Sequence, residues 1–348
     1  MTTLKSLAQY LNLSQATVSR ALNGFPEVGD KTRLRVLNAA SELGYQANAN
    51  ARKLATGRSR MIGIVLHSPD ELINAPTYVE ELANISHHLG DSDYDLLINS
   101  ARKGKALESF KRFVSSRAID GVIIKAPDVN DERIKYLLEQ DFPFVVHGRT
   151  DKEVDYAYFD IDNEGAASQS VNLLADLGHK RIAMLNAPSH FAFSAQREEG
   201  FKNTMKERGI DIADSFIVNR PMAEEEGYKA AIEWFKDKNS CSDLIPTAVV
   251  CSSVSQAYGL YLAAKELGII IGKDLSVIAH DDVIAHLKTE NFTPPLAVTR
   301  SPFTDSCKPL ADTIVAILSG VEPKNLQTIA PVELVVRKSI GVAHQEDI

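Results

Sequence analysis

The chain has 348 residues, of which 44% are hydrophobic and 24% are charged, a composition typical of a soluble globular protein with two or three domains. No apolar run reaches the ~18–20 residues of a membrane-spanning helix, and the N-terminus lacks the apolar core of a signal peptide, so we expect a cytoplasmic protein without a membrane partner. Three cysteines without metal-ligand spacing predict reduced, buried thiols, and we expect neither a metal nor a cofactor.

The net charge of −8 conceals an uneven distribution of charge along the chain. Residues 1–60 carry nine basic and three acidic side chains, a net charge of +6, whereas the remainder carries 29 basic and 43 acidic ones, a net charge of −14. Because basic side chains against phosphates supply much of the affinity for nucleic acids, this pattern predicts a nucleic-acid contact confined to the N-terminal end.

Two short helices joined by a tight turn are predicted near the N-terminus. Apolar residues at positions 4, 7, 8 and 11 mark the first helix, over 4–11. Ser14 is a suitable N-cap for the second helix, which runs to Leu22 and presents a polar N-terminal face. The small Ala8 lets the two helices approach closely, so the pattern predicts a helix-turn-helix.

A third helix is expected to follow, with Asp30 as its N-cap and Gly44 at its end. The side chains that we expect it to turn inward are Leu34, Leu37, Ala40 and Leu43. The next segment, 46–57, is polar and short-chained except for Leu54, which is typical of a linker.

The exposed face of the second helix carries side chains suited to reading bases. Gln15, Ala16 and Arg20 lie on it, since positions 16 and 20 are one turn apart. Arginine can fork onto guanine, glutamine onto adenine, and alanine can contact a thymine methyl group. The side chains able to bond phosphates are Ser14, Thr17, Ser19 and Asn23. An unrelated three-helix unit with a solvated face is the alternative.

The segment LKSLAQYLNLSQATVSRALNGFPEVGDKTRLRVLNAASELGYQANANARKLATG resembles the head and hinge of the lactose-repressor (LacI/GalR) family, and the resemblance continues through the rest of the chain. It implies a helix-turn-helix DNA-binding domain over 1–46, a hinge helix over 47–58, and an effector-binding and dimerisation core over 60–348. A homodimer of this kind binds a near-palindromic double-stranded operator.

The resemblance also gives roles to residues of the linker. It implies that Leu54 is an apolar wedge inserted between base pairs in the minor groove, flanked by Asn48, Ala51 and Lys53. Without the family, Leu54 would indicate local packing.

From Met61 onward, apolar strand segments alternate with amphipathic helices. This alternation predicts an α/β fold with parallel sheets covered on both faces, in two lobes with a cleft between them. The predicted strands are 61–66, 95–99, 120–124, 143–147, 181–186, 247–251 and 275–280. The predicted helices are 77–90, 104–116, 131–139, 163–177, 194–208, 224–236, 255–267 and 303–319. The resemblance implies a core like that of periplasmic sugar-binding proteins, with a first lobe of about 60–160 plus 291–319 and a second lobe of about 163–288 plus 322–343.

Matches to the family locate an effector site in the cleft. Arg197 lies at the start of a helix, and its planar fork suits vicinal hydroxyls or a carboxylate. Asp281 follows a strand at the end where open α/β sheets bind ligands, and its carboxylate can accept two hydroxyl protons. Asp282 is expected to be a helix cap. Phe193 could stack on a pyranose ring.

Other candidate ligand-binding residues rest on weaker signals. His67 and Asp70 follow the first strand of the core. Ser252 stands where many family members have asparagine, and His147 and Arg149 flank a glycine that stands where family members commonly carry aspartate. The pocket therefore differs from those of the lactose and purine repressors.

We interpret the chain as a sequence-specific DNA-binding repressor of carbohydrate-utilisation genes, controlled by a mono- or disaccharide bound between the lobes. A regulator of the same fold that responds to a nucleobase or a phosphoprotein is an alternative, as is a sugar-binding transport protein. An enzyme is not expected, because phosphate-binding glycine loops, nucleophile elbows and zinc motifs are missing from the sequence.

Overall fold

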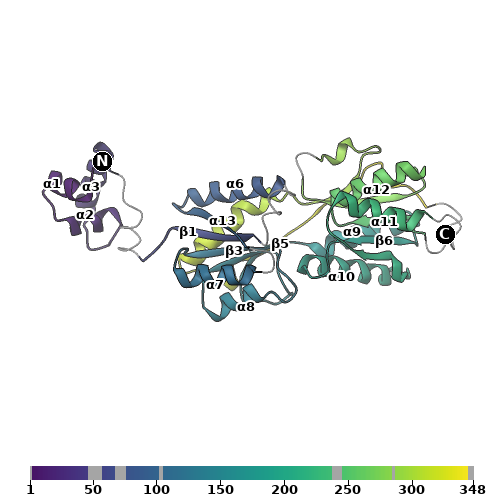
Figure 1. Ribbon diagram of the computed structural model, residues 1–348, viewed down its shortest axis with the longest axis horizontal. Helices are drawn as coiled ribbons and strands as arrows, with labels where there is room; N and C mark the ends of the chain where they lie inside the picture. The colour runs from purple at the N-terminus through teal and green to yellow at the C-terminus, as the bar shows by residue number, and fades with distance from the viewer. Residues whose placement is uncertain are drawn as a thin grey trace. The chain divides into compact units, whose positions relative to one another are not determined.

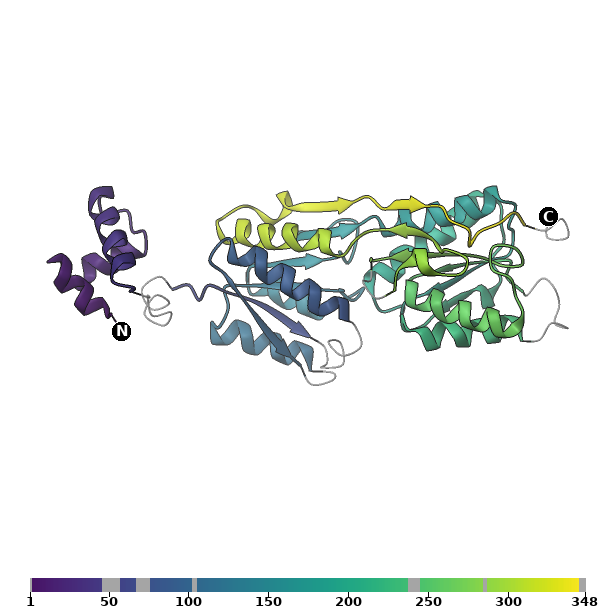
Figure 2. The same ribbon diagram turned by 90° about the horizontal axis from the view of Figure 1, so that it is seen from above.

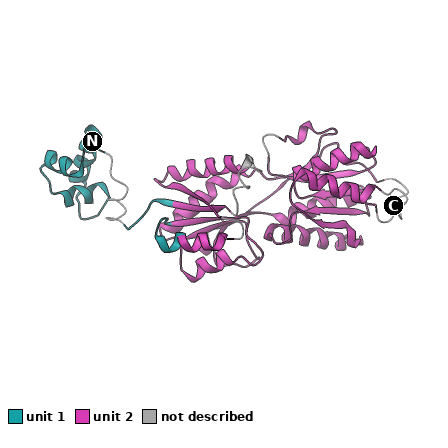
Figure 3. Ribbon diagram, viewed as in Figure 1, with its two compact units in different colours: residues 1–61, 113–120 teal, residues 62–112, 121–348 magenta. Residues whose placement is uncertain are grey.

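The computed structural model describes residues 2–45, 57–66, 76–101, 105–236, 245–283 and 287–343. The chain divides into two compact units: residues 1–61 and 113–120 form unit 1, and residues 62–112 and 121–348 form unit 2 (Figure 3). Within the described residues, every helix is too short or too polar to cross a membrane.

Unit 1 contains three short helices, α1 (Leu4–Leu11), α2 (Gln15–Leu22) and α3 (Asp30–Glu42) (Figure 1). Thr3 begins α1 with a capping box, in which its hydroxyl accepts from the backbone N–H of Ser6 while the Ser6 hydroxyl accepts from the N–H of Thr3. The helices enclose a small apolar core of Leu7, Ala8, Leu11, Val18, Ala21, Val28, Val36, Ala39 and Ala40.

The third helix differs from the prediction in its cap and in its buried face. Gly29, not Asp30, is the N-cap, and Asp30 is the first helical residue. Leu34 and Leu37 are 62% and 45% exposed, so their predicted inward orientation is wrong. The row that packs against the other helices is Val36, Ala39, Ala40 and Leu43. This row has the i, i+3, i+4, i+7 spacing of one helical face, and it overlaps in sequence with the row that was predicted.

The segment that enters the first strand is fixed by one carboxylate. Asp120 accepts hydrogen bonds from the backbone N–H and the hydroxyl of Ser59, at 2.6 and 2.8 Å, and from the backbone N–H of Arg60, at 2.9 Å. Three donors on one side chain hold residues 59–60 at the start of β1.

Unit 2 contains two six-stranded sheets, with the strand orders β11-β5-β4-β3-β1-β2 and β12-β10-β9-β8-β6-β7. The strands of the first sheet are β1 (Met61–Leu66), β2 (Asp95–Ser100), β3 (Gly121–Lys125), β4 (Phe144–His147), β5 (Ala157–Ile161) and β11 (Gln327–Ala330). Those of the second sheet are β6 (Ile182–Asn186), β7 (Ile217–Asn219), β8 (Ala248–Cys251), β9 (Ser276–Asp281), β10 (Ala297–Arg300) and β12 (Glu333–Val335). The strands of the first sheet from β11 to β1 run parallel to their neighbours, as do those of the second sheet from β10 to β7. β12 is antiparallel to β10.

Helices cover both faces of the second sheet. Successive strand residues point to opposite faces, so Val249 and Val277 pack with α11 (Glu224–Phe235) and α12 (Val254–Leu267). Their neighbours Val250 and Ile278 pack on the opposite side, with α9 (Asn163–Asp176) and α10 (Ala192–Glu207). The helices associated with the first sheet are α6 (Pro76–Gly90), α7 (Ala106–Ser116), α8 (Glu132–Glu139) and α13 (Thr304–Leu318).

The predicted two-lobed α/β architecture is confirmed. All seven predicted strands form within one residue of the expected bounds, and the eight predicted helices form within two. The strands β5, β7, β10, β11 and β12 were not among the seven, because each is short and none has a long apolar run.

The lobe boundaries fall later in the chain than expected. β10 belongs to the second sheet, where Val298 pairs with Ala279, although 291–319 was assigned to the first lobe. β11 belongs to the first sheet, where Thr328 pairs with Phe159, although 322–343 was assigned to the second. The last passage from the first sheet to the second therefore lies between β11 and β12 (Figure 2).

Candidate functional site

The N-terminal face of α2 is the first candidate site. Gln15, Ala16 and Arg20 are exposed on it, while Val18 and Ala21 on the opposite side are buried in the core of unit 1. A short helix held by its apolar side thus presents two long polar side chains and a methyl group to solvent. This is the arrangement that base recognition in a major groove requires.

The other predicted DNA-contacting residues of α2 fix the ends of the helix. The Ser14 hydroxyl accepts from the backbone N–H of Thr17 at 3.0 Å and lies 2.8 Å from the Thr17 hydroxyl. The Asn23 amide donates to the carbonyl of Ser19 at 2.8 Å. These bonds orient the polar groups at both ends of the exposed face. The predicted residues Asn48, Ala51, Lys53, Leu54, His67 and Asp70 lie outside the described residues.

Arg197 is the centre of the second candidate site, which we call the Arg197 site. It lies in the second turn of α10, is 6% exposed, and its guanidinium is 5.1 Å from the centre of the Phe193 ring. Its Nε donates to Asn163 Oδ1 and its Nη1 donates to the carbonyl of Ser252, each at 2.9 Å. Burial lowers the pKa of Arg197, and the charges of Asp282 and Asp160 oppose this effect. The two hydrogen bonds hold the side chain in one orientation.

Asn163, at the start of α9, joins this arginine to the first lobe. Its Nδ2 donates to Asp160 Oδ1 at 3.1 Å and to Gln196 Oε1 at 3.2 Å. The second oxygen of Asp160 accepts from Arg149 Nη1 at 2.6 Å. A buried chain of polar contacts thus runs from Arg149, after β4, through Asp160 and Asn163 to Arg197 in the second lobe.

Arg149 and Ser252 support this network. Arg149 is 6% exposed and is paired with Asp160, whose pKa is raised by burial in spite of that pairing. Ser252 is 2% exposed, and its hydroxyl donates to Asn186 Oδ1 at 2.6 Å. These contacts place both side chains in the protein interior, where they position other groups.

The two adjacent aspartates at the end of β9 have different surroundings. Asp281 accepts from the backbone N–H of Val283 at 2.7 Å and from the Thr289 hydroxyl at 3.3 Å, and burial raises its pKa. Asp282, whose side chain is 45% exposed, lies 3.2 Å from His280 Nε2. Partial burial favours a higher pKa for Asp282, but His280 and Arg197 outweigh this effect and lower the pKa. Asp282, which was expected to cap a helix, is therefore ionised, and its charge acts on Arg197.

A second charged cluster lies at the carboxyl ends of β3 and β4, two neighbouring strands inside the first sheet. His147, the last residue of β4, lies 3.3 Å from Glu81 Oε1, and Glu81 of α6 forms an ion pair with Lys125, the last residue of β3. The Lys125 ammonium is 3.7 Å from the centre of the Tyr78 ring. Sequence reasoning missed Lys125, although it ends a parallel strand just as Asp281 does, and it missed Glu81, whose position on a helix gives no such signal.

Backbone hydrogen bonds connect the two lobes beside Arg197. The N–H of Val129 donates to the carbonyl of His190, and the N–H of Ala192 donates to the carbonyl of Pro127, both at 2.9 Å. Residues 127–129 follow β3 of the first sheet, and residues 190–192 lead into α10 of the second lobe. We call this pair of bonds the interlobe clasp.

Two family models match the chain. Residues 3–48 match the model described as bacterial regulatory proteins, lacI family, and residues 171–340 match a periplasmic binding protein-like domain. The curated relatives include the HTH-type transcriptional regulator AglR of Rhizobium meliloti, 38% identical over 98% of this chain and 94% of the relative. They also include the HTH-type transcriptional regulator RafR of Escherichia coli, 31% identical over 93% of this chain and 94% of the relative.

Solved structures share the fold. A putative transcriptional regulator from Yersinia pestis matches with a TM-score of 0.74 and 27% identity, over 82% of this chain and all of that one. The lac repressor dimer bound to operator and an anti-inducer matches with a TM-score of 0.77 and 23% identity, over 97% of this chain and 98% of that one.

Proposed function

Because the chain belongs to the lacI family of bacterial regulatory proteins, we propose that it is a transcriptional repressor of carbohydrate-utilisation genes whose affinity for operator DNA is set by a sugar. The observation that carries the DNA-binding role is the exposed face of α2, with Gln15, Ala16 and Arg20, in a segment whose net charge is +6. We further propose that it acts in the cytoplasm, where its operator lies, as a homodimer without catalytic activity.

The chemistry of the Arg197 site favours a polyhydroxylated ligand. Arg197 offers N–H donors, Asp282 offers carboxylate acceptors, and the half-buried Phe193 offers a ring face. A sugar ring has hydroxyls that both donate and accept, and it has an apolar face that stacks on aromatic rings. Arg197, Asp282 and Phe193 are the residues that we propose to contact the sugar, with His147 on the opposite lobe.

The remaining predicted ligand-binding residues divide into two groups. Asp281, Arg149 and Ser252 make contacts within the protein, and we propose that they position the site rather than contact the sugar. His67 and Asp70 remain candidates from the sequence. In unit 1, the domain bounds 1–46 and 47–58 and the roles of Asn48, Ala51, Lys53 and Leu54 also remain proposals.

Control by the sugar requires that the two lobes respond to it together. The chain of contacts from Arg149 to Arg197 and the interlobe clasp both join the lobes next to the proposed contacts. A sugar that prefers one lobe arrangement over another by about 1–3 kcal/mol would change operator affinity roughly 5–150-fold. That range is sufficient for induction or co-repression.

The DNA-binding role is tested by selecting duplexes from a random pool with the full-length protein. Arg20→Ala should reduce the preference for the selected duplex over random DNA by about 1–3 kcal/mol, because a forked base contact is lost. Lys5→Ala, which removes an exposed charge from α1, is the matched control and should leave the preference intact. Retention of full preference by Arg20→Ala would refute the assignment of the reading helix.

The sugar-binding role is tested by thermal-shift screening of mono- and disaccharides. A sugar that raises the melting temperature of the wild type should lose most of that effect with Arg197→Lys, which keeps the charge but removes the fork. If the shift survives this substitution, the sugar binds elsewhere.

A further inference from the structure

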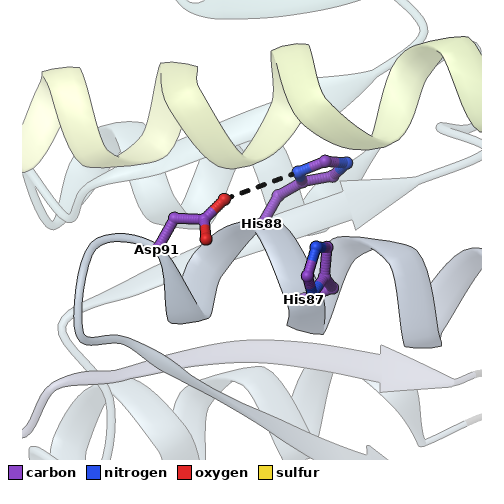
Figure 4. Close-up of side chains that lie close together, drawn as sticks. All are labelled: His87, His88 and Asp91. Carbon is purple, nitrogen blue, oxygen red and sulfur yellow. Dashed lines mark ion pairs between the residues drawn. The ribbon is translucent and has the colours of Figure 1, made fainter.

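The C-terminal end of α6 brings together two imidazoles and a carboxylate. His87 and His88 lie in the last turn of the helix, and Asp91 follows its last residue, Gly90 (Figure 4). One potential ligand atom from each of the three side chains lies within 4.8 Å of the other two. His88 Nδ1 lies 3.8 Å from Asp91 Oδ2, and the two imidazole centres are 5.3 Å apart.

The spacing of these residues explains why their side chains converge. His87 and Asp91 are four positions apart and His88 and Asp91 are three, so the carboxylate can reach each imidazole across one helical turn. Bonds of about 2.0–2.2 Å to a tetrahedral metal ion place its ligand atoms roughly 3.3–3.5 Å from each other. Modest side-chain rotations would close the observed separations to that value.

The ligand set indicates which ions fit. Imidazole nitrogen suits Zn²⁺, Cu²⁺ and Ni²⁺, whereas Ca²⁺ and Mg²⁺ prefer shells made of oxygen alone. Two histidines and one carboxylate supply three ligands and leave a position open to water. His87 and Asp91 are exposed and His88 is partly exposed, so an ion can enter from solvent.

The electrostatic surroundings favour a cation. The C-terminus of a helix carries partial negative charge from its unpaired carbonyl groups. Asp93 and Asp95 are exposed and follow within four residues of Asp91, and no lysine or arginine occurs in the sequence from 89 to 101. The His88–Asp91 pair alone would be an ordinary feature of a helix end. The feature that points to a metal ion is the second imidazole, His87, whose ligand atom lies within 4.8 Å of those of His88 and Asp91.

We propose that His87, His88 and Asp91 bind one divalent transition-metal ion of the Zn²⁺ class at the end of α6. The metal site lies in the first lobe and is separate from the Arg197 site, and the proposal does not depend on the identity of the effector.

The test is equilibrium dialysis of the full-length protein against Zn²⁺ after chelator treatment, together with the visible absorption of Co²⁺ as a probe of ligand geometry. We expect the wild type to bind one equivalent more than His87→Gln, and Asp91→Asn to lower the affinity of this site about 10-fold or more. The Co²⁺ spectrum of a nitrogen- and oxygen-ligated ion should weaken in both variants.

Asp93→Asn is the matched control, because it removes the same charge two residues away without removing a ligand atom. Asp93 has a backbone φ of 58°, which asparagine tolerates well, so the control should fold normally. Thermal unfolding without metal checks all three variants. Zn²⁺ binding that is equal in the wild type and His87→Gln, or equally weakened by Asp91→Asn and Asp93→Asn, would overturn the proposal, as would a wild type that takes up none of these ions.

Discussion

Replacing Asn163 by alanine should destabilise unit 2 far more than replacing Asn172, although both residues lie on α9 and both accept a hydrogen bond from an arginine Nε. Asn163 is 1% exposed, and its amide contacts Arg197, Asp160 and Gln196. Asn172 accepts from Arg208 at 2.7 Å in a contact that is open to solvent. The pair therefore separates the effect of burial from that of residue type.

The expected difference follows from the contacts of the two amides. Asn163 makes hydrogen bonds of 2.9, 3.1 and 3.2 Å with Arg197, Asp160 and Gln196, two of them charged partners, and a longer one of 3.4 Å with the carbonyl of Ile161. A bond to a charged group contributes about 1.5–3 kcal/mol, and leaving a buried partner unpaired costs about 1–3 kcal/mol. Because these effects are not additive, we expect Asn163→Ala to cost about 3–5 kcal/mol. Asn172→Ala should cost less than about 1 kcal/mol, as exposed polar substitutions do.

Urea unfolding followed by tryptophan fluorescence measures this difference directly. The single tryptophan, Trp234, lies buried on α11 and reports on the second lobe, where Arg197 is held. Free energies of unfolding that differ by less than about 1 kcal/mol between the two variants would show that the buried network does not stabilise the fold as its geometry indicates.

The interlobe clasp and the charged cluster of the first sheet lead to two further predictions. Ala192→Pro removes one donor of the clasp at the first position of α10, where proline fits, so the backbone amides of Asp128 and Val129 should exchange hydrogen faster. Glu224→Pro, at the first position of α11, is the control, and unchanged exchange in Ala192→Pro would contradict the role of the clasp. Burial favours a higher pKa for Glu81, but Lys125 and His147 outweigh this effect and lower the pKa of its carboxyl group. The stability that these contacts contribute is present above the pKa of glutamate in an unfolded chain, about 4.3. It should be lost as the pH falls from there through the lower pKa of Glu81 in the folded protein. Glu81→Gln should flatten this part of the melting-temperature profile, and parallel profiles would contradict the pairing.

The sequence predicted the regular core well because apolar runs and helical stripes record burial directly. It failed on the buried face of α3, where apolar residues at 34, 36, 37, 39, 40 and 43 fit two overlapping helical rows. It also failed on short strands such as β11, whose residues Gln327 and Thr328 carry no apolar pattern.

The candidate site shows the same limit. Arg197 and the paired aspartates could be located because each sits at the start of a helix or the end of a strand, positions that sequence patterns reveal. Asn163 could not be assigned to the site, because its hydrogen bond with Arg197 joins residues that are 34 positions apart and lie on two helices. Which of Asp281 and Asp282 interacts with the charge of Arg197 also depends on loop geometry, which residue spacing does not determine.

The way in which Arg197 is held bears on how finely the protein could tell one sugar from another. Two of the five N–H donors of its guanidinium are engaged by Asn163 and Ser252, which leaves a fork of fixed direction rather than a flexible cation. Ordering an arginine side chain costs about 1.5–2 kcal/mol, and here folding has already met that cost before any ligand arrives. A rigid fork cannot follow a hydroxyl that points the wrong way, so epimers that differ at a single carbon should differ sharply in their ability to act as effectors.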